Sequence, residues 1–182
     1  ASGNVGRKTI EILEKSKILF KDLYLVASKK SAGKKIKFRE KEIEIENLEN
    51  YDFSKAQITI FAAGSDIAKD WAPKAAKKTI VIDNSSFFRM QKNIPLVVSE
   101  VNPEALDKHE NIIANPNCST MQMVLALKPL HDEYKIKRVI VSTYQAVSGA
   151  GKEAMDELFD QTKNFLDKKN IVSKNFTKQI AF

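Results

Sequence analysis

The chain has 182 residues, 43% of them hydrophobic, and its 30 lysines and arginines outnumber its 23 acidic residues to give a net charge of +7. It is too apolar for a disordered chain, and six glycines and five prolines are too few for a fibrous or low-complexity one. The single cysteine, Cys118, excludes a disulfide scaffold and a cysteine-clustered zinc site, and it favours a reducing, cytoplasmic location. No apolar run is long enough to span a membrane, so we expect no membrane partner. With one cysteine in the chain we also expect no metal. The positive charge favours acidic partners, either nucleic acid or a phosphorylated small molecule.

The first third of the chain predicts one helix followed by short strands. Helical periodicity begins after a glycine-containing turn and continues to Leu19-Phe20. Residues 23–27 form a continuous apolar run, which is typical of a buried strand. Residues 35–46 alternate between apolar and charged side chains, which predicts a hairpin at a sheet edge.

From residue 58 onwards, predicted strands, turns and helices follow one another. The predicted strands cover 58–62, 79–82, 111–114 and 139–142, and a further strand begins at 179. The predicted helices cover 67–77 with Asp66 as N-cap, a segment that starts at 102–104, a segment from the turn 115–120 to about 131, and 152–166. Strand–turn–helix units in succession predict a parallel α/β sheet. The chain also opens without a strand before its first turn and ends at the start of one, so we expect it to be part of a longer protein.

The turn at the start of the chain has the spacing of a phosphate-binding loop. Ser2-Gly3-Asn4-Val5-Gly6 matches the second half of a dinucleotide fingerprint, in which a helix N-terminus holds a pyrophosphate. The strand at 23–27 is followed by Lys29, Lys30 and Ser31, and no acidic residue lies between Leu23 and Arg39. This pattern suits the 2′-phosphate of NADP rather than the free ribose of NAD. The alternatives are an ordinary turn and a solvated lysine loop. Together these features predict a Rossmann-type NADP-binding domain over 1–117, followed by the start of a second α/β domain over 118–182.

Cys118 lies where a strand and a Pro-Asn turn lead into a helix. A thiol at a helix N-terminus is expected to have a lowered pKa, which favours the nucleophilic thiolate. Beside a nicotinamide, a thiolate can form a thiohemiacetal with an aldehyde, and hydride transfer then gives a thioester. The alternative is a buried, inert cysteine. The two histidines, His109 and His131, are expected to be surface residues, so the catalytic base is expected beyond Phe182.

Three segments resemble the bacterial aspartate-semialdehyde dehydrogenase family, namely 82–90, 114–120 and 142–151, and the likeness extends along the whole chain. The resemblance implies the conversion of aspartate 4-semialdehyde, phosphate and NADP⁺ to 4-aspartyl phosphate and NADPH. Physiologically the reaction runs in the reductive direction, in the synthesis of lysine through diaminopimelate and of methionine and threonine.

The resemblance also implies the roles of particular residues. Cys118 matches the nucleophile, Arg89 and Asn117 match the phosphate site, and Gln145 matches a residue that binds the amino-acid substrate. The implied cofactor-binding residues are Ser2, Gly3, Asn4, Val5, Lys30, Ser31, Asn84, Ser148 and Gly149. The family commonly has Arg-Ser where this chain has Lys30-Ser31, which predicts a weaker NADP preference, because lysine lacks the bidentate fork of arginine.

The second domain is implied to contain the catalytic histidine, further substrate-binding arginines and the homodimer contact, most of it beyond residue 182. We therefore expect these residues alone to be inactive. Three alternatives remain open. One is an enzyme like N-acetylglutamyl-phosphate reductase, which shares the cysteine chemistry, and another is a non-catalytic basic module that binds nucleotides or nucleic acid. The third, for a sequence that is complete, is a degenerate cofactor-binding relic. The interleaving of 23 acidic residues with the basic ones counts against a nucleic-acid partner.

Overall fold

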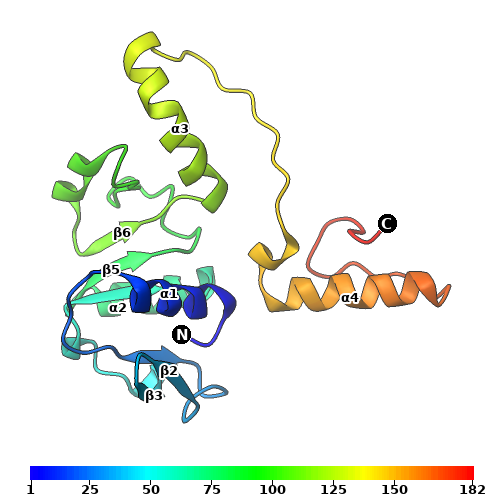
Figure 1. Cartoon of the computed structure of the whole chain (residues 1–182), viewed down its shortest axis with the longest axis horizontal. Helices are drawn as coiled ribbons and strands as arrows, with labels where there is room; N and C mark the ends of the chain where they lie inside the picture. The colour runs from blue at the N-terminus through cyan, green and yellow to red at the C-terminus, as the bar shows by residue number, and fades with distance from the viewer. The chain divides into compact units, whose positions relative to one another are not determined.

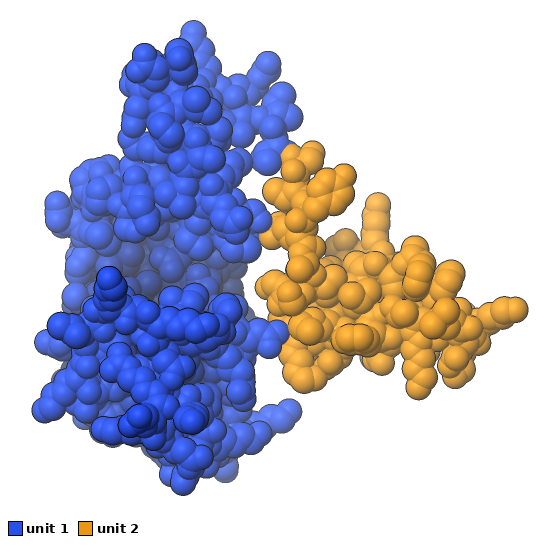
Figure 2. All heavy atoms as spheres, viewed as in Figure 1, with its two compact units in different colours: residues 1–141 blue, residues 142–182 orange.

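The structure, a computed structural model, describes all 182 residues. The chain divides into two compact units, residues 1–141 and 142–182, which Figure 2 distinguishes by colour. None of the helices has the length and apolar character that crossing a membrane needs. The predicted domain boundary between residues 117 and 118 stays a prediction.

The first unit contains most of the regular structure (Figure 1). Its helices and strands are α1 (Asn4–Lys15), β1 (Leu25–Ala27), β2 (Lys35–Phe38), β3 (Lys41–Asn47), β4 (Ile58–Phe61), α2 (Ser65–Ala75), β5 (Ile80–Asp83), β6 (Ile112–Ala114) and α3 (Cys118–Tyr134). Short 3₁₀ turns cover Leu48–Asn50, Phe53–Lys55 and Pro103–Lys108. The second unit contains α4 (Lys152–Leu166), preceded by a 3₁₀ turn at Val147–Ala150.

The strands β1, β2 and β3 form one small sheet in the order β1-β3-β2. β1 runs parallel to β3, and β2 pairs antiparallel with β3 as the predicted hairpin. Alternating side chains place Phe38 and Ile45 in the core, where they pack with Leu25 and with Ile10 of α1. The sheet therefore buries one face and leaves its charged side chains in solvent.

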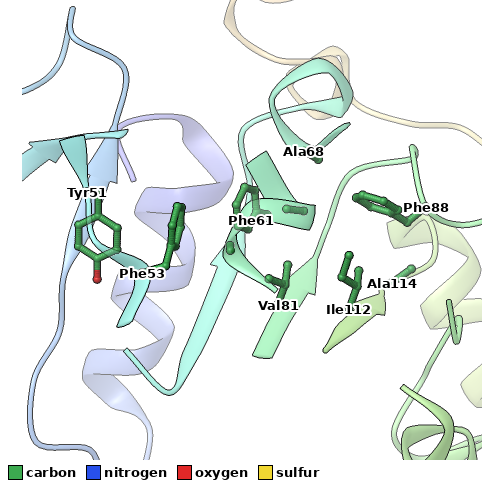
Figure 3. Close-up of a cluster of buried hydrophobic side chains, with 10 residues drawn as sticks. Tyr51, Phe53, Phe61, Ala68, Val81, Phe88, Ile112 and Ala114 are labelled. Atoms are coloured by element: carbon green, nitrogen blue, oxygen red, sulfur yellow. The ribbon is translucent and has the colours of Figure 1, made fainter. Parts of the chain in front are cut away.

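The strands β4, β5 and β6 form a second, fully parallel sheet with β5 in the middle. α2 packs against β4 and β5 through Ala68, Ala72 and Ala75, whose spacing puts them on one face of the helix. Figure 3 shows how the core beneath them is filled, with Val81 of β5 lying between side chains from β4 and β6. Because the carboxyl ends of parallel strands meet at one edge, this sheet brings the loops after β5 and β6 together.

Several predicted elements are confirmed, including the parallel strands, the 35–46 hairpin and the helix at 152–166. Others are wrong. Residues 139–142 form no strand, and Ile140 is 85% exposed, because an apolar run becomes a strand only where another strand accepts its hydrogen bonds. No strand begins at 179 either.

The predicted ends of the early helices also need correction. The first helix ends at Lys15, not near Phe20, because Ser16 is extended and closes the last turn through its N–H to Leu13 O. Asp66 is not an N-cap, since α2 begins one residue earlier behind Gly64, whose φ of 87° suits glycine alone. The helix expected from residue 102 is the 3₁₀ turn Pro103–Lys108.

Candidate active site

Arg89 connects the carboxyl ends of two neighbouring strands. Its Nε donates to the carbonyl oxygen of Asn115 at 2.9 Å, and its Nη2 donates to the carbonyl oxygen of Asn84 at 3.3 Å. Asn84 directly follows β5 and Asn115 directly follows β6. The side chain of Arg89 is half-buried. An arginine has five N–H donors, so these two bonds leave three donors available to another acceptor.

The backbone under this arginine is fixed by an extension of the sheet. Asn84 N donates to Phe61 O at 3.0 Å, and Asn115 N donates to Asp83 O at 2.8 Å. The parallel ladder therefore continues one residue past the strand ends. The two carbonyl groups that hold Arg89 therefore belong to residues that are hydrogen-bonded into the sheet.

Cys118 is the first residue of α3, three positions after Asn115, and it is exposed. The N-cap residue is Asn117, whose Oδ1 accepts a hydrogen bond from Ser119 N at 2.9 Å. The capping bond uses only the oxygen of the Asn117 amide, so its NH₂ group can still donate. The predicted position of Cys118 at a helix start is confirmed, and the alternative of a buried cysteine is wrong for this structure.

Asp83, the last residue of β5, has its carboxyl group in the interior at 0% exposure. Its Oδ2 accepts a hydrogen bond from Ser85 Oγ at 2.6 Å, and its Oδ1 has no partner. Burial raises the pKa of Asp83, while the bonds from Ser85 and the positive charge of Arg89 act in the opposite direction. The sequence alone predicted no role for Asp83 or Ser85. The available signal was an acidic residue at the end of an otherwise apolar strand.

The predicted pyrophosphate turn forms the start of α1. Gly3 is the N-cap residue, and no side chain caps the first turn of the helix. A methyl group on Gly3 would meet no atom of the chain within 4 Å, so the space beside it is open. A methyl group on Gly6 would instead lie 2.8 Å from Ala1 O, so only glycine fits there without a shift. Gly3, Asn4 and Val5 are exposed, and Ser2 is half-buried.

The predicted ribose-phosphate loop lies in the same part of the unit. The Ala1 amino group donates to Val26 O at 2.7 Å, so the glycine turn lies beside β1. The loop after β1 turns back through a hydrogen bond from Ser31 N to Ser28 O at 2.8 Å, and it leaves Lys30 exposed. An uncapped helix start and a nearby lysine–serine pair are donors that suit the phosphates of a dinucleotide. These residues therefore fit such a cofactor.

Three predicted site residues belong to the second unit. Gln145 is exposed, and its Oε1 accepts a hydrogen bond from Thr143 Oγ1 at 3.3 Å. Ser148 and Gly149 lie on the exposed 3₁₀ turn Val147–Ala150.

Comparison with known proteins identifies the family. The description "Semialdehyde dehydrogenase, NAD binding domain" matches residues 1–109, and "Semialdehyde dehydrogenase, dimerisation domain" matches residues 127–182. The chain belongs to the semialdehyde dehydrogenase family.

Within that family, relatives named aspartate-semialdehyde dehydrogenase confirm the resemblance seen in the sequence. The chain is 49% identical to the aspartate-semialdehyde dehydrogenase of Shewanella violacea over 185 residues, which cover 100% of this chain and 55% of the relative. It matches the crystal structure of aspartate semialdehyde dehydrogenase II complexed with ASA from Vibrio cholerae with a TM-score of 0.91 and 46% identity, over 100% of this chain and 55% of that one. The Candida albicans enzyme with NADP matches with a TM-score of 0.65 and 28% identity, over 74% of this chain and 46% of that one. The chain thus spans about half the length of the curated relatives it matches.

Proposed function

We propose that this chain is the N-terminal part of an aspartate-semialdehyde dehydrogenase. The enzyme would convert aspartate 4-semialdehyde, phosphate and NADP⁺ to 4-aspartyl phosphate and NADPH, and would run in the reductive direction in the cell. One observation carries the proposal: an exposed cysteine begins α3 directly after the strand end at which Arg89 is anchored. Family membership and the named relatives support it.

In this proposal Cys118 divides a difficult reaction into two easier steps. The thiolate attacks the aldehyde carbon, and the resulting thiohemiacetal loses hydride to become an acyl thioester. A dinucleotide held by the turn Ser2–Val5 would supply the hydride acceptor. The second step is attack of a phosphate oxygen on the thioester carbonyl, which breaks the carbon–sulfur bond and returns the thiolate. The N-terminus of α3 would stabilise the negative charge on sulfur and on the oxyanion beside it.

Phosphate needs a cation that is held in place, and Arg89 provides one. Its backbone acceptors are fixed by the sheet, and three of its N–H donors remain for phosphate oxygens. The side-chain NH₂ of Asn117, one residue before the nucleophile, would donate to the same anion. Gln145 would bind the amino-acid part of the substrate.

The proposed cofactor is NADP. The open turn Ser2–Val5 would hold the pyrophosphate, and Lys30 with Ser31 would bind the 2′-phosphate. A solved neighbour with NADP supports this assignment. Asn84, Ser148 and Gly149 complete the proposed set of contacts.

The remaining parts of the proposal concern the whole protein. A catalytic domain that begins near residue 118 would supply the base and a homodimer contact, and the match of residues 127–182 to a dimerisation domain supports the dimer. The enzyme would act in the cytoplasm, in the synthesis of lysine through diaminopimelate and of methionine and threonine. The 182 residues alone would be inactive.

The test replaces the nucleophile in the full-length protein. Cys118→Ser should abolish the phosphate-dependent reduction of NADP⁺ by aspartate 4-semialdehyde, while NADPH binding, measured by fluorescence, should stay within about twofold of the wild type. Ser119→Ala, which changes the neighbouring residue and keeps the thiol, is the control and should retain turnover. Unchanged turnover in Cys118→Ser would overturn the thioester route.

A second substrate separates the main proposal from its nearest alternative. N-acetylglutamyl-phosphate reductase would use the same cysteine chemistry on N-acetylglutamate 5-semialdehyde. The relatives named as aspartate-semialdehyde dehydrogenases favour the aspartate compound. A higher kcat/KM for the acetylated substrate would reverse this choice.

A further inference from the structure

A buried hydrogen-bond relay lies directly behind the proposed phosphate site. Ser85 Oγ donates to the buried carboxylate of Asp83 at 2.6 Å and accepts a hydrogen bond from Phe87 N at 3.2 Å. A carboxylate, a hydroxyl and a backbone amide are thus connected within five residues. The relay fixes the path of the chain as it leaves β5.

The residue between the two hydrogen-bonded side chains of the relay carries one of the two carbonyl groups that hold Arg89. Asn84 lies between Asp83 and Ser85, and its carbonyl oxygen accepts the Nη2 bond from Arg89 at 3.3 Å. On the far side of the relay, Phe88 is buried in the core at 3% exposure. The segment between Asp83 and Phe88 is therefore fixed at both ends, and Arg89 follows immediately.

A carboxylate costs more to bury than a neutral residue that could close the same turn. Asp83 is fully buried, and one of its oxygens has no hydrogen-bond partner. Its charge also attracts the guanidinium of Arg89. The free-energy cost of burying this carboxylate is high for a residue that only closes a turn, but it suits a site that must hold one cation at a fixed place.

We propose that Asp83 and Ser85 are positioning residues for phosphate, because they fix the carbonyl group of Asn84 and thereby the guanidinium of Arg89. This inference rests on the proposed function. Both residues are buried, so neither side chain is placed to touch a substrate. Loss of the relay should misplace the anion site selectively and leave the dinucleotide turn at the start of α1 intact.

The test uses Ser85→Ala in the full-length protein, with initial rates measured against phosphate, NADP⁺ and aspartate 4-semialdehyde in turn. We expect the KM for phosphate to rise about tenfold, which corresponds to one lost hydrogen bond to a charged group. The KM for NADP⁺ should change by less than about threefold, because Asn84 is one of nine proposed cofactor contacts and its N–H stays bonded to Phe61 O in the sheet. Ser85→Thr, which keeps the hydroxyl, should restore the KM for phosphate. A purely structural role would lower kcat and thermal stability without this selectivity.

A matched control is available on the same unit. Ser99 Oγ donates to the Glu100 carboxylate at 2.7 Å, but this pair is exposed. Ser99→Ala should therefore leave all three KM values unchanged. A wild-type protein with no activity on aspartate 4-semialdehyde would overturn the proposed function itself. An active wild type with an unchanged phosphate KM in Ser85→Ala, or with equal rises for all three substrates, would overturn the positioning role alone.

Discussion

The two hydrogen bonds of Arg89 make Arg89→Lys an informative substitution. A lysine has one nitrogen, so it cannot reach both Asn84 O and Asn115 O while also facing phosphate. At least one bond to a charged donor is lost, at a cost of about 1.5–3 kcal/mol. Because about 1.4 kcal/mol corresponds to a factor of ten, the KM for phosphate should rise about 10- to 100-fold.

The assay is phosphate saturation of the full-length enzyme at fixed, saturating NADP⁺ and aspartate 4-semialdehyde. Urea unfolding should also show a loss of stability of about 1–3 kcal/mol, because one carbonyl group is left without its donor. Arg138→Lys, at an exposed position, is the control and should change neither quantity. If Arg89→Lys keeps the wild-type KM for phosphate, Arg89 is not the phosphate anchor, and the reasoning from its geometry fails.

Two further predictions concern the cofactor loop and the second unit. Lys30→Ala should weaken NADPH binding about fivefold and leave NADH binding unchanged, and equal losses for both cofactors would contradict a 2′-phosphate contact. The control is the exposed Lys17→Ala. Bonds from Asn175 N–H and Lys174 N–H hold the pKa of Glu157 below its usual 4.5. Because the pKa of Glu157 is lower in the folded than in the unfolded protein, its ionised carboxylate stabilises the fold at pH values above the unfolded-state pKa of about 4.5. This stabilisation is lost as the pH falls from there through the folded-state pKa. Urea unfolding across this range should show a weaker pH dependence in Glu157→Gln, and identical curves would refute the assignment.

The fold was predictable where the pattern itself determines the structure. The helix at 152–166 has an amphipathic period and follows a glycine, and the structure gives those same bounds. The run at 139–142 is as apolar as β5, yet it forms no strand. The difference lies in the neighbouring strands. β5 is flanked by β4 and β6, and the hydropathy of a segment does not reveal whether other strands lie beside it.

The candidate site was predictable in part. The position of Cys118 at a helix start follows from the local sequence, because a polar turn precedes an apolar helix. The bond from Arg89 to Asn115 joins residues 26 positions apart, and no local pattern reveals it. The same holds for the burial of Asp83, which depends on β5 being the central strand of its sheet.

The position of Arg89 would let the proposed phosphate site select one anion on a chain with a net charge of +7. Exposed lysines attract any anion, but salt screens them and their flexible stems fix no geometry. Arg89 is half-buried, and two backbone carbonyl groups at neighbouring strand ends orient its guanidinium. The proposed selectivity for phosphate at this site would therefore depend on the parallel sheet, because only adjacent parallel strands place those two carbonyl groups at the same edge.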